Sequence, residues 1–308
     1  MKKVRFLIIL FIILLALTNC VSLLSEEPPS ATQNGFDTSA TIKSTQTPTQ
    51  NPSTQTPVPS PTWTHLPTLS LGEAEKAIAN LLVSNGGCEL PCWWGMIPGE
   101  TRWDEAEQFL NTFTTSIGQG QQGTHQEDDG YHFHTNYTVH YIISGHTNEG
   151  LALFSIRDGI IIGIDIDSPG NEFDYQLYQL LSSYGLPQAV YVLTYPNVPF
   201  DVLPFRILIH YSNQGIYAIY EYPAENDGNT ITSCPDASGP SLHLDSPNQP
   251  YKKYLMSFED SAKRLMGVNE NNLLVDLQTA KQMDITTFYE TFKNPEVREC
   301  LKTPTHLW

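Results

Sequence analysis

Basic residues are scarce in this chain. Its 308 residues include 16 Lys and Arg against 33 Asp and Glu, a formal net charge of −17. Affinity for nucleic acids comes largely from Lys and Arg side chains that displace counterions from phosphates. The charge therefore argues against DNA or RNA as a partner, and we expect no nucleic-acid ligand.

Signatures of known catalytic sites are also missing. The chain has no Gly-x-Ser-x-Gly, no His-Glu-x-x-His, and no Ser-x-x-Lys accompanied by its partner motifs. We therefore assign no catalytic residue and expect no cofactor, although absent motifs lower the case for an enzyme without excluding it.

The N-terminal apolar run is too short for a membrane span. Phe6 to Leu17 amounts to about twelve apolar residues, whereas a spanning helix needs about 20. Three positive charges precede the run and a short polar exit follows it, as in a secretory signal peptide. We expect residues 1–19 to be such a signal and to be removed.

Cysteines are few and odd in number, at five. Leu17-Thr18-Asn19-Cys20 resembles the lipobox of bacterial lipoproteins, with Asn19 where that family usually has Gly, Ala or Ser. The resemblance implies that Cys20 carries a diacylglyceryl anchor and becomes the new N-terminus. The alternative is a plain secretion signal, or an uncleaved anchor, with an incidental cysteine.

Four cysteines remain, and an even set in an exported chain predicts disulfides. Three pairings are possible. We favour the local pair Cys88–Cys92 together with the distant pair Cys234–Cys300. A Cys88–Cys234 fragment in non-reducing peptide mapping would contradict this pairing.

Composition divides the rest of the chain. Residues 20–66 are rich in Ser, Thr, Gln and Pro and poor in apolar side chains, so we expect a disordered, lipid-anchored stalk. Residues 67–250 carry four basic and 22 acidic side chains, while residues 251–308 carry eight of each. We expect a folded acidic body over 67–250 and a helical tail over 251–308.

Periodicity predicts an α+β fold of two tandem units, each a helix with a three-stranded antiparallel sheet. We expect the tail to be stapled to the body if Cys300 pairs with Cys234. Capping boxes, glycine stops and apolar alternation predict helices over 71–84, 101–113, 173–184, 257–266 and 284–293, and strands over 131–143, 151–156, 160–166, 189–195, 205–211 and 216–222. The remaining segments, 223–250 included, are expected to be loops.

Cys88-Glu-Leu-Pro-Cys92-Trp-Trp-Gly-Met-Ile-Pro-Gly-Glu-Thr101 resembles a signature of uncharacterised bacterial lipoproteins, which implies no known activity. Ile97 to Thr101 and Tyr184-Gly-Leu-Pro187 are also similar to elements of SmpA/OmlA-type outer-membrane-assembly lipoproteins and of β-lactamase-inhibitor-like tandem domains. Those families scaffold or bind proteins without catalysis, and the resemblance implies their fold more than their role.

Three groups of residues are candidate sites. His132 and His134 share one face of a strand and could bind one metal ion, although a solvated strand face is the simpler interpretation. Trp93 and Trp94 could bind a carbohydrate or protein partner if exposed, or fill the core if buried. The Gly-x-Gly-x-x-Gly string at 118–123 lacks the strand and helix of a dinucleotide site and is interpreted as a flexible loop.

Together these features favour an exported, lipid-anchored, surface-displayed binding or scaffold protein without enzymatic activity. It would sit on the extracytoplasmic face of a cell membrane or outer membrane and bind a protein or carbohydrate ligand. The alternative is an exported hydrolase or metal-dependent enzyme of unrecognised type.

Overall fold

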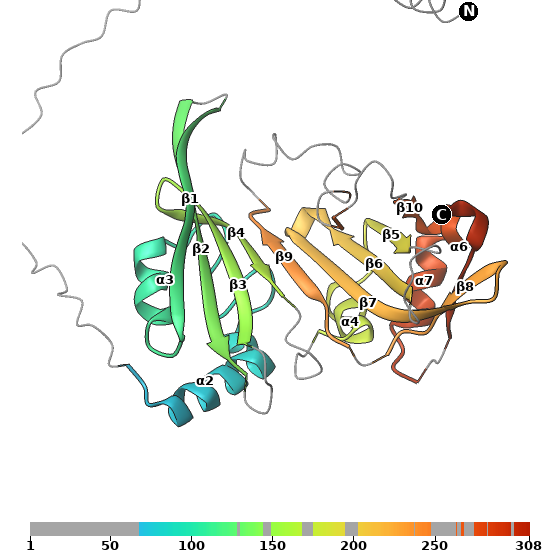
Figure 1. Ribbon diagram of the computed structural model, residues 1–308, viewed down its shortest axis with the longest axis horizontal. Helices are drawn as coiled ribbons and strands as arrows, with labels where there is room; N and C mark the ends of the chain where they lie inside the picture. Colours follow the sequence, from blue (N-terminus) through green and yellow to red (C-terminus); the bar gives the residue numbers. More distant parts are fainter. Residues whose placement is uncertain are drawn as a thin grey trace, which may run out of the picture. The chain divides into compact units, whose positions relative to one another are not determined.

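The computed structural model (Figure 1) describes one compact unit within Thr62–Trp308. The described residues are 68–127, 130–143, 149–167, 175–194, 203–236, 238–247, 263, 266–267, 274–281, 283–296 and 299–308. The expected signal peptide, Cys20 and the whole of the expected stalk lie outside these ranges.

Helices are short and stand at both ends of the unit and between its strands. They are α2 (Leu71–Ser84), η1 (Asn85–Gly87), α3 (Trp103–Leu110), α4 (Leu177–Tyr184), η2 (Ser212–Gln214), α6 (Leu277–Lys281), α7 (Ile285–Phe292) and η4 (Thr305–Leu307). At the predicted start of α2, the Ser70 backbone N–H donates to the Glu73 carboxylate at 3.0 Å. Asp284 accepts from the backbone N–H of Thr287 at 2.8 Å, so the predicted 284–293 helix is confirmed.

Antiparallel strands make up most of the unit (Figure 1). They are β1 (Ser116–Glu127), β2 (Gly130–Ile142), β3 (Glu149–Arg157), β4 (Ile160–Ile166), β5 (Ala189–Thr194), β6 (Leu203–Tyr211), β7 (Ile216–Asn226), β8 (Thr230–Ser233), β9 (Ser241–Asp245), β10 (Val275–Asp276) and β11 (Leu301–Pro304). They form one 11-stranded sheet in the order β1-β2-β3-β4-β9-β7-β6-β5-β10, with β8 paired to β7 and β11 paired to β8.

The predicted pair of helix-plus-three-strand units is therefore wrong. Strand β9 comes from the segment 223–250 that was expected to be a loop, and it pairs with β4 on one side and with β7 on the other. This single strand joins the two expected sheets into one. The five residues Ser-Leu-His-Leu-Asp do alternate polar and apolar side chains, but so short a run between Pro- and Gly-rich segments is a weak strand signal, and its pairing depends on contacts distant in sequence.

Strand β1 corrects a second expectation. The glycine- and glutamine-rich residues 118–123, expected to be a flexible loop, lie inside β1, which pairs with β2 on both sides of a bulge between Gln119 and Gln122. Nearly all of β1 is exposed on both faces, so it lacks the apolar alternation that identifies a half-buried strand. Backbone hydrogen bonds to β2 hold β1 in a strand, although the side-chain pattern of β1 does not predict one.

The first helices cover one face of the β1–β4 part of the sheet. The Trp103 ring of α3 stacks on Tyr137 of β2 with centroids 4.1 Å apart, and it also contacts Phe154 of β3. The backbone N–H of Trp103 donates to the Gly159 carbonyl at 2.8 Å, which anchors the start of α3 to the β3–β4 turn. Helix and hairpin thus share one core.

Around α4, tyrosine hydroxyls tie the helix to the sheet. Tyr220 donates to the Tyr175 carbonyl at 2.8 Å, and Tyr211 donates to the Gly185 carbonyl at 2.7 Å. Gly185 ends α4 with a positive φ of 76°. Each bond joins one end of α4 to a buried strand beneath it.

The two favoured disulfides, Cys88–Cys92 and Cys234–Cys300, are confirmed. The second bond joins the end of β8 to the start of β11, beside their strand pairing. The expected helical tail also contributes strands, since β10 pairs with β5 and β11 with β8. Most of the helix expected over 257–266 lies outside the described residues.

Within the part of the chain that the structure describes, no helix combines the length and the apolar character that a membrane crossing requires.

Candidate binding surface on the projecting hairpin

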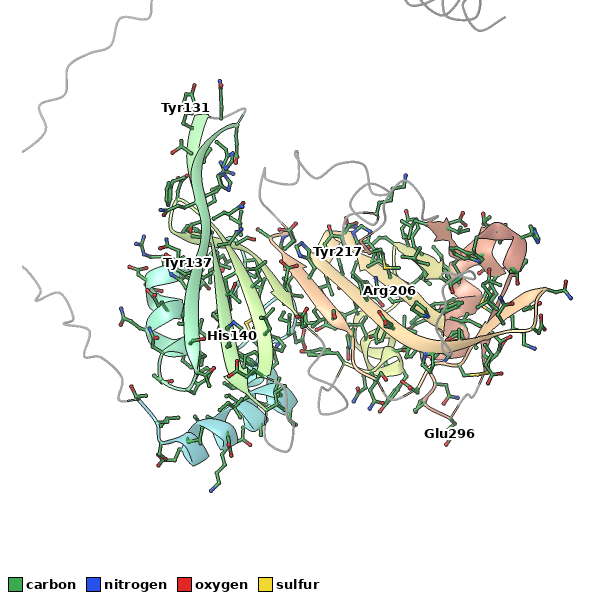
Figure 2. All side chains as sticks on the ribbon, viewed as in Figure 1. Tyr131, Tyr137, His140, Arg206, Tyr217 and Glu296 are labelled. Carbon is green, nitrogen blue, oxygen red and sulfur yellow. A yellow bond between two sulfur atoms is a disulfide. The ribbon has the colours of Figure 1, made fainter. Side chains whose placement is uncertain are left out.

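The β1–β2 hairpin is the longest strand pair of the unit, and its outer end projects beyond the rest of the sheet (Figure 1). Pairing of β2 with β3 begins at His134, which lies opposite Arg157. Of the described strands, only β1 and β2 run past this point. Figure 2 shows Tyr131 at the outer end and Tyr137 nearer the body.

One face of the hairpin consists of aromatic and amide side chains. Directly opposed residues share a face of an antiparallel pair. The pairs on this face, which we call the aromatic–amide face, are Gln119–Tyr137, Gln122–Thr135, Thr124–Phe133 and Gln126–Tyr131. This surface was not predicted from the sequence, because residues 118–123 of β1 were expected to be a loop. The alternation of Tyr131, Phe133, Thr135 and Tyr137 was the signal available.

The outer aromatic rings of this face are open to solvent. Tyr131 is 73% exposed and Phe133 is 45% exposed. Burying an aromatic or large aliphatic side chain is worth about 1.5–3 kcal/mol, so two such rings left in water on one strand face form a candidate interaction surface. Closer to the body, Gln119 Nε2 donates to the Tyr137 hydroxyl at 3.3 Å, so amides and rings contact each other.

The opposite face carries a network of charged side chains, which we call the charged brace: Glu127, His132, His134, Arg157 and Asp158. Glu127 accepts from His134 Nε2 at 2.6 Å through one oxygen and pairs with Arg157 Nη1 at 3.2 Å through the other. Arg157 Nη2 lies 2.8 Å from His132 Nε2, and His132 Nδ1 lies 2.5 Å from Asp158 Oδ2.

Hydrogen-bond roles in the brace follow from the arginine. A guanidinium can only donate, so His132 Nε2 must accept, and the ring proton lies on Nδ1 and is donated to Asp158. That bond, and a second from the Phe133 backbone N–H, hold the pKa of Asp158 below its usual value. The side chains of Glu127 and Arg157 are only 8% and 11% exposed, so the two form a largely buried ion pair.

The brace explains why the outer hairpin keeps its shape. A hairpin of two strands without a third is marginal in water. Asp158 in the β3–β4 turn and Arg157 at the end of β3 clamp His132 and Glu127 of the outer strands. The exposed rings therefore stand on a positioned strand pair.

The structure does not favour His132 and His134 as metal ligands. They share a face as predicted, but each is bonded to a different carboxylate and Arg157 lies between them. Across the described ranges, no group of three or more His, Cys, Asp or Glu side chains has the arrangement of a metal site. Asp128 and Asp129, the acidic residues that follow Glu127 in the sequence near these histidines, lie outside those ranges.

Trp93 and Trp94 are buried, at 0% and 4% exposure, which agrees with the core alternative and leaves no ring face for a ligand. The two rings stack on each other at 4.9 Å, and Trp94 meets the Tyr141 ring edge-on at 5.1 Å. Asn85 organises the disulfide turn beside them: its Nδ2 donates to the carbonyls of Cys88 and Cys92, and its Oδ1 accepts from the Trp94 backbone N–H.

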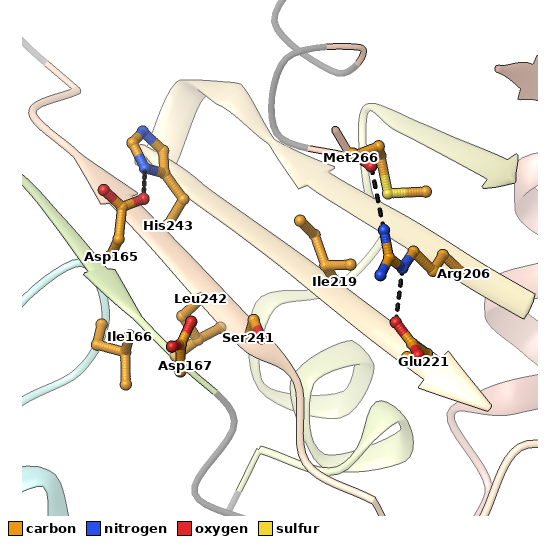
Figure 3. A pocket seen from close by; sticks show the side chains of 10 residues that line it. All are labelled: Asp165, Ile166, Asp167, Arg206, Ile219, Glu221, Ser241, Leu242, His243 and Met266. Carbon is orange, nitrogen blue, oxygen red and sulfur yellow. Dashed lines mark hydrogen bonds and ion pairs between the residues drawn. The ribbon is translucent and has the colours of Figure 1, made fainter. Parts of the chain in front are cut away.

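A shallow groove of about 270 Å³ lies on the sheet face formed by β4, β9, β7 and β6 (Figure 3). Asp165 of β4 is hydrogen-bonded to His243 Nδ1 of β9. Ser241 lines the same groove two residues before His243. A carboxylate that orients an imidazole is one component of acid–base chemistry.

The other charged side chains of the groove differ in their state of pairing. Arg206 Nε donates to Glu221 at 2.6 Å, and its Nη1 donates to the Met266 carbonyl at 3.3 Å (Figure 3). Partial burial, together with the neighbouring charge of Asp165, raises the pKa of Asp167. The groove therefore holds Arg206, whose guanidinium is already hydrogen-bonded, and Asp167, whose carboxylate takes up a proton more readily than usual.

Searches of protein-family models, of curated proteins and of solved structures each found no match to this chain.

Proposed function

We propose that this protein is an exported, lipid-anchored, surface-displayed binding protein without enzymatic activity, and that the outer β1–β2 hairpin is its ligand-binding element. The observation that carries the proposal is the pair of exposed rings, Tyr131 and Phe133, on a strand pair held by the charged brace. A rigid projection with exposed aromatic rings suits recognition, because little order is lost on binding.

The anchor part of the proposal rests on residues 1–66. A signal peptide ending at Cys20 supports attachment through a diacylglyceryl group, and the Ser/Thr/Pro/Gln-rich stalk would hold the folded unit away from the membrane. The lipoprotein-like motif from Cys88 to Thr101 supports the same class. We place the protein on the extracytoplasmic face of a cell membrane or outer membrane.

Metabolic labelling with a radioactive fatty acid tests the anchor. The full chain should carry label and sediment with membranes, while Cys20→Ser should lose the label. Label that persists in Cys20→Ser would refute Cys20 as the lipid site.

Capture of surface components by the full chain tests the binding element. We expect a double substitution, Tyr131→Ala with Phe133→Ala, to abolish capture of the specific component. Leu186→Ala removes another exposed apolar side chain (51% exposed), away from the hairpin, and should retain capture. Unchanged capture by the hairpin variant would refute the proposed site.

A hydrolase remains the second candidate function, and the Asp165–His243 pair in the groove is the observation that favours it. On this alternative, the full chain should cleave ester or amide substrates and His243→Ala should lose that activity. A residual rate equal to that of the unsubstituted chain would remove His243 from any catalytic role.

A further inference from the structure

We infer that the aromatic–amide face of the hairpin binds an extended, electrically neutral glycan. This inference deepens the proposed binding function and rests on it. It assigns the chemical class of the ligand and the side chains that recognise it.

Aromatic rings supply the first part of the recognition. A pyranose ring has a face of C–H groups that packs on the face of an aromatic ring, because the ring face is negative and apolar. Tyr131 and Phe133 are two residues apart on one strand face, so their Cα atoms are about 6.6–6.8 Å apart along the strand. Two platforms in a line suit consecutive units of one sugar chain.

Side-chain amides supply the second part. Gln122 and Gln126 on β1 flank Phe133 and Tyr131 on β2, and both are exposed. An amide offers two donors and an acceptor, which matches the mixed donor and acceptor character of sugar hydroxyls. The Tyr131 hydroxyl donates to Gln126 Oε1 at 3.5 Å. This hydrogen bond is long and therefore weak, so a sugar hydroxyl can replace it.

Charge selects a neutral ligand. None of the residue pairs that form the aromatic–amide face is charged, and the charged side chains of the hairpin that the structure describes lie on the opposite face, where Glu127 pairs with Arg157. The surrounding body, residues 67–250, carries 22 acidic and four basic side chains. Polyanions are repelled by this body, and a cationic ligand finds no carboxylate on the face itself.

An extended peptide added to the edge of β1 is the competing ligand. The edge is less suited than the face, because the β1–β2 register is interrupted between Gln119 and Gln122 and a bulge disturbs the regular ladder that an added strand needs. The exposed rings also lie on the face of the sheet, where an edge-bound strand would not cover them.

Affinity electrophoresis with the full chain in detergent tests the inference. The acidic chain migrates through native gels that contain hydroxyethyl cellulose, a soluble mixed-linkage β-glucan, or a soluble chitin derivative. We expect at least one of these neutral polysaccharides to retard it. Tyr131→Ala and Phe133→Ala should each weaken that binding about tenfold.

A control on the other face of the same hairpin makes the test specific. His125 is exposed and lies opposite His132, on the brace side, so His125→Ala should bind the polysaccharide like the unsubstituted chain. Circular dichroism of each variant checks that the fold is kept. Equal loss in the His125 variant would overturn the assignment to the aromatic–amide face.

The outcomes separate the ligand class from the proposed function. If none of the polysaccharides retards the chain, and a surface protein is captured in a manner that requires Tyr131 and Phe133, the glycan is refuted and the binding function stands. If capture of every ligand is unchanged when Tyr131 and Phe133 are replaced, the proposal that the hairpin is the binding element fails as well.

Discussion

Two tyrosines of β7 differ in what their hydroxyl groups contact. Tyr220 and Tyr222 are both buried, and their rings lie nearly parallel at 6.0 Å. Tyr220 donates to the Tyr175 carbonyl at 2.8 Å, whereas the Tyr222 hydroxyl has no hydrogen-bond partner among the described residues. The pair separates the effect of a satisfied buried hydroxyl from that of an unsatisfied one.

We predict that Tyr220→Phe lowers the free energy of unfolding by about 1–2 kcal/mol, because the Tyr175 carbonyl loses its donor. Tyr222→Phe should leave stability unchanged or raise it, because it removes a hydroxyl group that loses its hydration on burial and gains no hydrogen bond in return. Urea denaturation of both variants measures the difference. A larger loss for Tyr222→Phe would show that its hydroxyl is bonded after all.

Asn85 shows how one residue can organise a motif. Its φ of 49° lies in the left-handed region that Asn tolerates better than most residues, and this ends α2. Its buried side chain then fills three hydrogen bonds to the turn that contains Cys88, Cys92 and Trp94. The disulfide turn is thus attached to the end of the helix.

At the scale of elements, the outer hairpin depends on the charged brace. Arg157 contacts Glu127 and His132 from the end of β3, where its side chain is 11% exposed. Removing one partner of a covered ion pair leaves the other charge poorly solvated.

We predict that Arg157→Met lowers the free energy of unfolding by about 2–3 kcal/mol and speeds amide exchange of the outer hairpin more than that of α3. Arg102→Met is the control, because Arg102 and Asp104 pair at 57% and 62% exposure, where solvent screens the pair, and the substitution should change stability little. Hydrogen exchange read by mass spectrometry compares them. Equal protection of the hairpin in both variants would contradict the brace.

Strand β9 needs a glycine beside it. At Gly215, before β7, φ is 70° and a Cβ atom would stand 2.0 Å from the Asp245 carbonyl oxygen. The Asp245 backbone N–H donates to the Gly215 carbonyl at 2.8 Å, so these two segments of the backbone are in direct contact. The close approach brings the end of β9 to the start of β7.

We predict that Gly215→Ala lowers the free energy of unfolding by about 3 kcal/mol or more, since both the backbone angle and the Asp245 contact resist a methyl group. Gly159→Ala has a similar φ of 81° with open space around the Cβ position, and should cost only about 1 kcal/mol. Thermal and urea unfolding measure both. Equal losses would mean that the backbone angle alone explains the effect.

For the whole molecule, buried tyrosines make stability depend on alkaline pH. Burial raises the pKa of Tyr217 to about 12, and burial also raises the pKa values of Tyr141, Tyr211 and Tyr222. The folded chain therefore holds these hydroxyl protons more tightly than the unfolded chain. This contribution is fully present below the ordinary tyrosine pKa of 10.0 and is lost as the pH rises from there through the folded values.

We predict that the urea midpoint falls continuously as the pH rises above about 10, and that Tyr217→Phe makes the fall shallower. Absorbance of tyrosinate, followed together with circular dichroism, should show buried tyrosines ionising as the chain unfolds. Ionisation of all tyrosines near their ordinary pKa with the fold intact would contradict this account.

The sequence predicted features that depend on neighbouring residues. Ser70 and Glu73 at the start of α2, and Asp284 at the start of α7, indicated helix starts because caps act within one turn. Apolar alternation indicated β2 and β3, in which burial alternates, while apolar runs indicated strands such as β4 and β6, which are buried on both faces.

What the sequence could not show was the partner of each strand and the exposure of each ring. By itself it determined the acidic body, the helix starts and most strands, all properties of composition or of neighbouring residues, and among three possible cysteine pairings it favoured the one that joins the local couple and leaves Cys234 for Cys300. Only the tertiary structure decided that β9 joins two sheets into one, that Trp93 lies inside, and that Tyr131 and Phe133 lie outside. The reason is physical: a tryptophan and a tyrosine are both partly apolar, and contacts between segments distant in sequence decide which of them loses its water.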